Sequence, residues 1–206
     1  MEEVLDLYEM KLPEDEVLVC MDESNKQLIG EVHQPIACKS GSPIKEDYAY
    51  IRNGTKAIFM FFAPDEGYRE VIVENYKTKL EWAENMKYLS DNIFPNKKKI
   101  HNVLDNFKTH HKSAFYENFF PEEANRLMHR FTFHYTPKHA SWLNMAEIEF
   151  SALFTQCLNK RIANEEILKN NIEIWTKERN NQKKKIEWKF TTADARVKLK
   201  KLYPSI

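Results

Sequence analysis

The chain has 206 residues, of which 42% are hydrophobic and 30% are charged, a composition typical of a globular protein with one sizeable core. No apolar run approaches the roughly 20 residues that a membrane-spanning helix needs, and the acidic N-terminal segment lacks the layout of a signal peptide. The three cysteines are odd in number and far apart, so we expect free thiols and a cytoplasmic location.

Charge is unevenly distributed along the chain, although the formal net charge is zero. Residues 159–206 contain 13 Lys and Arg against 6 Asp and Glu, so the C-terminal end is basic and suited to a polyanionic partner. Lysines that only solvate a helical surface would produce the same count, and both interpretations stay open. The four glycines form no glycine-rich phosphate-binding motif, which argues against a nucleotide-binding loop.

The first half of the chain is predicted to be rich in strands after an N-terminal helix that ends at Pro13. Runs of β-branched and apolar residues, bounded by polar or turn residues, indicate these strands. They lie at residues 16–24, 26–43 (a second strand and a loop), 57–62 and 68–75. The last two are expected to form a hairpin, because residues 64–67 have the composition of a tight turn.

The second half of the chain is predicted to alternate helices with strands. Apolar residues at helical spacing indicate the helices, and Thr78 is a suitable cap for the first of them. The helices are expected at residues 78–94, 113–130 (two pieces broken at Pro121), 144–159, 164–180 and 194–203. Strands are expected at residues 98–110, with its end at Asp105, and at 131–137.

This order of elements predicts an α/β fold. We expect the runs of the first half to supply strands 1–3 of a five-stranded sheet, joined as antiparallel hairpins. The alternating helices and strands that follow imply a mixed sheet with helices on its faces.

Three acidic residues fall at the predicted ends of elements. Asp22 ends the first strand, Asp105 ends the fourth, and Glu147 lies in the first turn of the helix that follows the fifth. Ligands of open α/β sheets gather at strand ends, so these side chains would form an oxygen-rich site if they converge. Mg²⁺ and Mn²⁺ prefer such ligands, and two ions roughly 3.5–4 Å apart could support phosphodiester chemistry.

Each of these acids also has a purely structural interpretation. Asp22 and Asp105 could accept backbone hydrogen bonds in loops, and Asn144 with Glu147 three residues later resembles a helix capping box. Residues two apart on a helix point nearly opposite ways, so Glu147 and Glu149 cannot serve one site. The spacing alone leaves open which of the two faces it.

Three stretches of the sequence resemble a known family: "VLVCMDES" (17–24), "VLDNFKTHH" (103–111) and "HYTPKHASWLNMAEIEFS" (134–151). They are similar to the DDE transposase catalytic domain of the mariner superfamily, specifically its bacterial insertion-sequence 630 branch. The resemblance covers nearly the whole chain, including the ending "WKFTTADARVKLKKLYPSI", and differs from the commoner family form at Phe107 and Lys108.

The resemblance implies a ribonuclease-H-like fold and assigns the three acids. The family's catalytic and metal-binding residues fall on Asp22, Asp105 and Glu147, which leaves Glu149 as an ordinary flanking residue. Two Mg²⁺ or Mn²⁺ ions are implied as cofactors. The implied reaction is cleavage of DNA at transposon ends by water, followed by attack of a DNA 3′-hydroxyl on target DNA.

The resemblance also implies partners and a domain organisation. Transposon-end and target DNA are the implied partners, with no membrane and no small-molecule cofactor, and a homodimer is left open. We expect a ribonuclease-H-like catalytic core over residues 1–160 and a helical, lysine-rich extension over 161–206. The helix-turn-helix DNA-binding modules that begin complete transposases of this type are expected to be absent.

Several other polar residues near the motifs are candidates for supporting roles. Asn106 either hydrogen-bonds the metal-binding carboxylates or shapes a turn, and Asn144 is a helix cap. His139 is expected to orient a loop or contact the DNA backbone, and Trp142 either anchors a loop or stacks on a base. Lys183, Lys184 and Lys185 either bind DNA phosphates or solvate a linker. The histidine spacing matches no closed zinc ligand set.

The leading functional hypothesis is therefore a transposase catalytic domain, located in the bacterial cytoplasm and associated with the nucleoid when bound to DNA. Two alternatives stay open. One is a non-catalytic remnant that binds DNA or dimerises, and the other is a general metal-dependent nuclease of the same fold.

Overall fold

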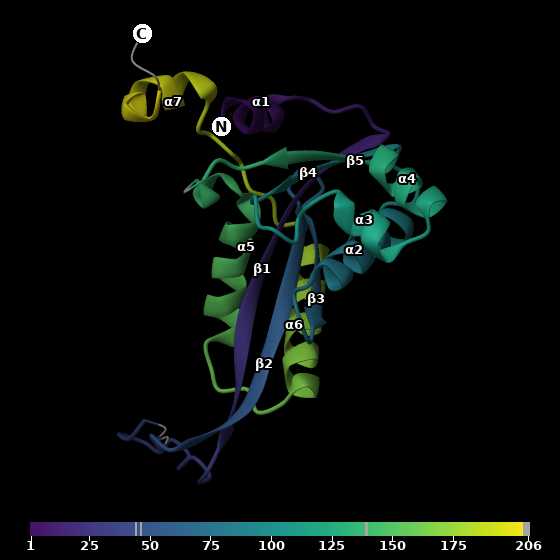
Figure 1. Ribbon diagram of the computed structural model, residues 1–206. Helices are drawn as coiled ribbons and strands as arrows, with labels where there is room; N and C mark the ends of the chain where they lie inside the picture. The colour runs from purple at the N-terminus through teal and green to yellow at the C-terminus, as the bar shows by residue number, and fades with distance from the viewer. Residues whose placement is uncertain (44, 46, 139, 204–206) are drawn as a thin grey trace.

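A five-stranded sheet lies at the centre of the computed structural model, which describes residues 1–43, 45, 47–138 and 140–203 (Figure 1). The strands are ordered β3-β2-β1-β4-β5. β1 pairs antiparallel with β2, and β2 with β3, whereas β1–β4 and β4–β5 are parallel. The predicted mixed five-stranded sheet is thus confirmed. The strand bounds are β1 Glu16–Glu31, β2 Tyr50–Ala63, β3 Tyr68–Glu74, β4 Lys99–Leu104 and β5 Phe131–Tyr135.

The first strand is longer than the sequence indicates. Separate strands over residues 16–24 and 26–43 were expected, but β1 runs unbroken from Glu16 to Glu31. Its polar middle stays in the sheet because the backbone ladder to β2 continues past it, from Asp22↔Met60 to Lys26↔Lys56 and beyond. What ends near Asp22 is the pairing with β4, whose last pair is Cys20↔Val103. The prediction of two strands was therefore wrong.

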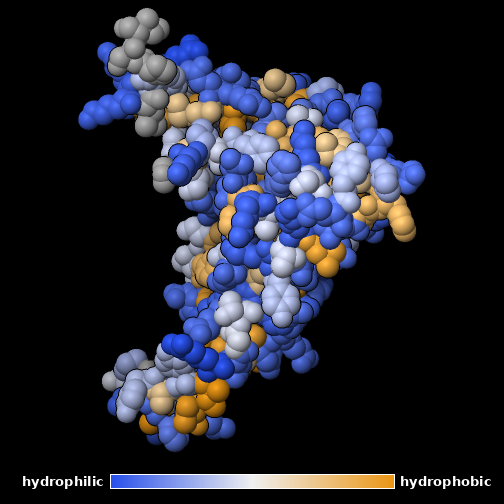
Figure 2. Space-filling model, viewed as in Figure 1, coloured by the Kyte–Doolittle hydropathy of each residue, from blue (hydrophilic) through white to orange (hydrophobic). Residues whose placement is uncertain are grey.

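Beyond the helices, β1 and β2 extend together as a hairpin arm, visible at the bottom of Figure 1. Hydrophobic atoms gather toward its tip in Figure 2. Val32, Ile36 and Ile51 are 46%, 63% and 51% exposed there. Residues 50–55 of β2 are all exposed in this arm, whereas residues 57–63 of the same strand are all buried in the central sheet, where helices cover it.

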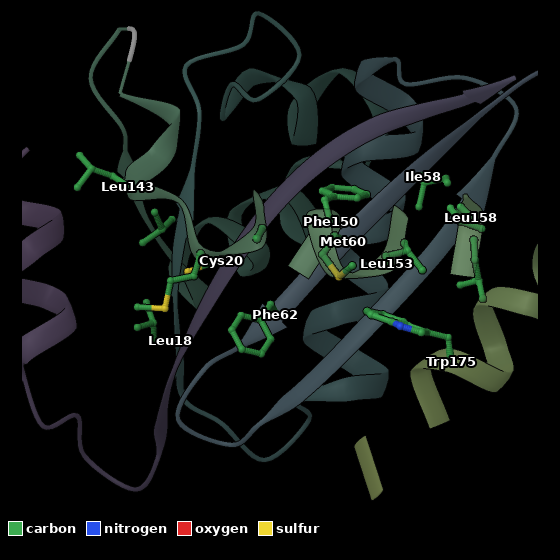
Figure 3. Packing of buried hydrophobic residues seen from close by; sticks show 14 of the residues in the cluster. Leu18, Cys20, Ile58, Met60, Phe62, Leu143, Phe150, Leu153, Leu158 and Trp175 are labelled. Carbon is green, nitrogen blue, oxygen red and sulfur yellow. The ribbon is translucent and has the colours of Figure 1, made fainter. Parts of the chain in front are cut away.

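Helices cover both faces of the central sheet. α5 (Met145–Leu153) and α6 (Glu165–Asn181) lie on one face, and α2 (Lys79–Tyr88), α3 (Ser113–Asn118) and α4 (Pro121–Arg130) lie on the other (Figure 1). Alternate strand residues enter the two cores, as period-two side-chain alternation requires. Cys20 and Met60, for example, belong to the same core as Phe150 of α5, with Met60 next to Phe150 (Figure 3), whereas Val19 and Phe59 belong to the core on the opposite side.

The helix boundaries follow from local chemistry. Thr78 forms a complete capping box with Glu81 at the start of α2, and Pro121 occupies the first turn of α4, where its missing N–H costs nothing. The predicted break at Pro121 is confirmed. The helix expected over 144–159 is α-helical only to Leu153 and continues as a π-helical turn over Phe154–Leu158.

The two ends of the chain meet beside the sheet. α1 (Glu2–Glu9) contacts α7 (Thr192–Lys198), and Arg196 forms a bidentate ion pair with Glu2 at 2.7 and 2.8 Å. α7 ends earlier than the predicted 194–203 helix, and a 3₁₀ turn follows over Lys200–Leu202. Within the described ranges, no helix is both long enough and apolar enough to cross a membrane.

The lysine-rich C-terminal segment shares the core of the preceding chain. Ile162, Leu168, Ile172 and Trp175 belong to the same buried cluster as Leu153 of α5. This packing fixes α6 against β3 and the turn after α5.

Candidate active site

The strand register places Asp22 and Asp105 side by side. Cys20 of β1 pairs with Val103 of the parallel neighbour β4, and each aspartate follows two residues after its member of that pair. Asp105 is the first residue after β4, as expected. Asp22 lies where β1 leaves its β4 neighbour while still pairing with Met60 of β2. Two aspartates far apart in sequence therefore reach the same edge of the β1–β4 pair.

Asn144 brings the start of α5 to the same place. Its side chain is buried, and its amide donates a hydrogen bond to the backbone carbonyl of Met21 at 2.8 Å. Its side-chain oxygen caps the helix by accepting from the N–H of Ala146 at 3.1 Å. The residue before Asp22 is thus tied to the N-terminus of α5, and Glu147 lies in the first turn of that helix.

The capping-box interpretation of Glu147 does not hold. The backbone N–H of Asn144, which a capping-box glutamate would have to bind, donates to the carbonyl of Ser141 at 2.7 Å. The cap at Asn144 is therefore complete without the Glu147 side chain. Glu147 is half-buried, and its carboxylate has no role in closing the helix.

The pKa of Asp22 is shifted by its surroundings. Burial, followed by repulsion from the carboxylates of Glu23, Asp105 and Glu147, raises the pKa of Asp22 to about 7. Asp105 and Glu147 are thus among the charges that act on Asp22, and they are the smallest of the contributions to its raised pKa. Among the described residues, however, no three His, Cys, Asp or Glu side chains are already arranged to hold a metal ion.

The oxygen atoms of these acids are only partly used by the protein. Oδ1 of Asp22 accepts from the N–H of Glu23 at 2.7 Å. Oδ1 of Asp105 accepts from the N–H of Phe107 at 3.1 Å and contacts Nδ1 of His110 at 2.7 Å. Within the described part of the chain, neither Oδ2 atom nor the carboxylate of Glu147 has a hydrogen-bond partner. Hard oxygen donors of this kind suit Mg²⁺ or Mn²⁺.

A buried histidine that the sequence did not single out for this role adjoins the acids. His110 is 1% exposed and lies between two carboxylates, with Nε2 2.9 Å from Oε2 of Glu23 and Nδ1 2.7 Å from Oδ1 of Asp105. Burial alone would lower the pKa of His110, but the two carboxylates outweigh it and raise the pKa to about 9. The hydrogen bond from His110 in turn holds the pKa of Asp105 below its ordinary value.

Glu149 is not the ordinary flanking residue that was expected. It is 1% exposed and forms ion pairs with Arg69 at 3.0 Å and with Arg179 at 2.8 Å. The sequence held a signal for this: Glu149 shares its helix stripe with Leu153, which lies in the core. A charge on a buried stripe needs partners, and here they come from β3 and α6. Its role is therefore to join these elements to α5.

The remaining predicted residues have mixed placements. Asn106 is exposed and makes no side-chain hydrogen bond within the described chain. Trp142 is 41% exposed; its ring stacks on Trp188, with centroids 6.5 Å apart, and meets the edge of Phe190. Trp142 thus anchors the C-terminal segment and keeps an open face. His139 lies outside the described residues.

The three lysines lie at another part of the sheet. Lys183, Lys184 and Lys185 are exposed. The backbone of Lys183 packs against Gly67, and the carbonyl of Lys184 accepts from Arg69 at 2.5 Å. Gly67 is in the β2–β3 turn, seven residues along the chain from Met60, the β2 partner of Asp22. The structure therefore does not bring these lysines together with the carboxylates.

Solved structures of a mariner transposase are similar to this chain. The Mos1 mariner paired-end complex with Mn has 14% sequence identity and a TM-score of 0.56, over 88% of this chain and 55% of the other. The Mos1 strand transfer complex has 13% identity and a TM-score of 0.57, over 85% and 51%. These likenesses show a shared ribonuclease-H-like fold. The chain spans about half the length of the Mos1 chains it matches.

Sequence comparisons give the family. A search of curated protein sequences finds no significant match. The sequence profile described as DDE superfamily endonuclease matches residues 17–169, a range that contains Asp22, Asp105 and Glu147 and covers more than half of the chain. This chain therefore belongs to the DDE superfamily endonuclease family.

Proposed function

We propose that this chain is the catalytic domain of a transposase in the insertion-sequence 630 branch of the mariner superfamily. It would cleave DNA at transposon ends and transfer the cut strand to target DNA, in the bacterial cytoplasm. The observation that carries the proposal is the strand register that sets Asp22 beside Asp105, with Glu147 in the first turn of the helix that Asn144 ties to β1, in a member of the DDE endonuclease family. The motif "HYTPKHASWLNMAEIEFS" supports the branch.

Asp22, Asp105 and Glu147 are the residues that would hold two Mg²⁺ or Mn²⁺ ions. When bound, such ions activate an attacking water or 3′-hydroxyl and stabilise the leaving oxygen of a phosphodiester. Asp22 gives up its proton on loading, since its pKa of about 7 leaves it partly protonated near neutral pH. Asp105 is already ionised, because its pKa is held low by His110.

DNA is the partner that this proposal requires. The similar solved structures include a Mos1 complex with a left transposon end, and the C-terminal segment of this chain is basic. Trp142, in the 3₁₀ turn just before Asn144, is 41% exposed, and a base could stack on it. Lys183–Lys185, beside the β2–β3 turn, would contact phosphates of the same duplex.

The proposal is tested by incubating the purified protein with Mn²⁺ and DNA that carries the element's ends. We expect nicking and strand joining, and a loss of at least about 100-fold in Asp22→Asn, Asp105→Asn and Glu147→Gln, because each change removes a metal-binding charge. Glu166→Gln, an exposed acid in the first turn of α6, is the matched control and keeps its activity.

Two results would count against the proposal. A wild-type protein that neither nicks nor joins such DNA contradicts catalysis by this chain alone. Cleavage of DNA without transposon ends, at an equal rate, would identify a general nuclease of the same fold instead.

A further inference from the structure

A chain of three polar side chains links β1 to the loop after β4. Glu23 follows Asp22 on β1 and, by strand alternation, points to the opposite face of the sheet. Its side chain is only 4% exposed, and its Oε2 lies 2.9 Å from Nε2 of His110, an ion-pair contact without hydrogen-bond geometry. His110 reaches Asp105 through its other ring nitrogen at 2.7 Å. The strand that carries one metal-binding candidate is therefore connected to the other candidate through a buried imidazole.

The imidazole of His110 is held from several sides. Its ring lies 5.9 Å from the ring of Trp82 and 5.7 Å from the ring of Phe107, centroid to centroid. Its backbone carbonyl accepts from the hydroxyl of Tyr135 at 2.9 Å, and its N–H donates to the carbonyl of Phe107 at 2.9 Å. Both backbone and ring are thus fixed, so the direction of Nδ1 is fixed as well.

The fixed ring of His110 restrains the side chain of Asp105. That side chain is 45% exposed and would otherwise be free to rotate. Oδ1 of Asp105 is held by His110 and by the N–H of Phe107, so Oδ2 is kept turned away from these donors. Partners that orient a ligating carboxylate in this way commonly change metal affinity by 10–100-fold when removed.

We propose that His110 is a positioning residue, which orients the Asp105 carboxylate for metal binding and is itself held in place by Glu23. This inference rests on the proposed function, because it assumes that Asp105 binds a metal ion. His110 acts through Asp105 and touches neither metal nor DNA.

The test exploits the two ring nitrogens separately. In His110→Asn the side-chain amide takes the place of Nδ1 and can still donate to Asp105, whereas in His110→Gln it takes the place of Nε2 and reaches only toward Glu23. Mn²⁺ affinity of the full chain is measured without DNA by electron paramagnetic resonance, which counts free Mn²⁺. We expect His110→Gln to bind Mn²⁺ at least about tenfold more weakly, and His110→Asn to stay within about threefold of the wild type.

The outcomes separate the inference from the function. His111→Gln is the control, since His111 is exposed and, among the residues that the structure describes, hydrogen-bonds only Ser113; it should bind Mn²⁺ as the wild type does. Equal losses in His110→Asn and His110→Gln, or no loss in either, overturn the inference. If either variant fails to fold, Glu23→Gln replaces it, and we expect its Mn²⁺ affinity to fall about threefold. An unchanged Mn²⁺ affinity in Glu23→Gln overturns the inference. A wild type that binds no Mn²⁺ overturns the proposed function, and the inference with it.

Discussion

Asp22 has a pKa of about 7, against an ordinary value of 3.8, because it is buried among other carboxylates. The folded state therefore holds a proton on Asp22 between about pH 4 and pH 7, while the unfolded state does not. Stability falls with rising pH wherever the folded state binds more protons. The carboxylate of Asp22 thus destabilises the metal-free protein increasingly as the pH rises through this window.

Asp22→Asn should remove this pH-dependent cost. A shift of one pKa unit corresponds to about 1.4 kcal/mol, and partial solvent access reduces that value. We therefore expect the free energy of unfolding of Asp22→Asn, relative to that of the wild type, to rise on the order of 2 kcal/mol between pH 5 and pH 8. Urea unfolding of the metal-free proteins at both pH values measures it. A constant difference between the two proteins across this range would contradict the assigned environment of Asp22.

Asn144 makes an element-scale connection, because it both caps α5 and ties the helix to β1. Asn144→Asp keeps the capping oxygen but loses the amide donor to Met21. We expect Mn²⁺ affinity to fall about tenfold or more, because α5 no longer holds Glu147 beside Asp22. Asn164→Ala removes the cap of α6 and is the control, since it should cost about 1 kcal/mol of stability and leave Mn²⁺ affinity intact. Equal affinities in both variants would show that the tie is irrelevant to the site.

Glu149 joins three elements through the fully buried Arg69 and the partly buried Arg179. Removing one partner of a buried ion pair leaves an uncompensated charge and typically costs about 3–5 kcal/mol. We expect Glu149→Gln to lose about 3 kcal/mol in chemical unfolding, because Arg69 also donates to Gly67 and Asn180. Glu173→Gln breaks an exposed pair on α6 and should change stability by less than about 1 kcal/mol. A cost at Glu149 as small as that would contradict the buried network.

The arrangement of the elements was predictable where side-chain periodicity carried the signal. Alternating and helical spacing located the core strands, the cap at Thr78 and the break at Pro121. The continuity of β1 was not visible, because its polar middle is held by a backbone ladder to β2 and not by buried side chains. The polar middle of β1 therefore made one strand look like two.

The candidate site, like the fold, was only partly predictable from the sequence. Asp22, Asp105 and Glu147 were proposed from their motifs. The register sets the two aspartates at one edge of the β1–β4 pair, and Asn144 ties the helix that carries Glu147 to β1. The chain through Glu23 and His110 depends on tertiary contacts between residues 87 positions apart, which no local pattern encodes. The burial of Glu149 was hinted at only by its apolar stripe.

At the scale of the whole molecule, the basic C-terminal segment should add a salt-sensitive contribution to DNA binding. Replacing Lys183, Lys184 and Lys185 by Ala removes three cations from an exposed surface. If all three contact phosphates, the slope of log K against log salt becomes shallower by about 2–3, since each contact contributes roughly 0.9. An unchanged slope in fluorescence anisotropy titrations would assign these lysines to a solvated linker.

The most direct measurement is Mn²⁺ binding to the wild type and to Asp22→Asn, Asp105→Asn and Glu147→Gln, with folding checked by thermal melting. If three separate elements build one metal centre, each single change weakens Mn²⁺ binding by at least about tenfold, because the remaining ligands cannot complete the site. A folded variant of any of the three that binds Mn²⁺ as tightly as the wild type would contradict the shared site.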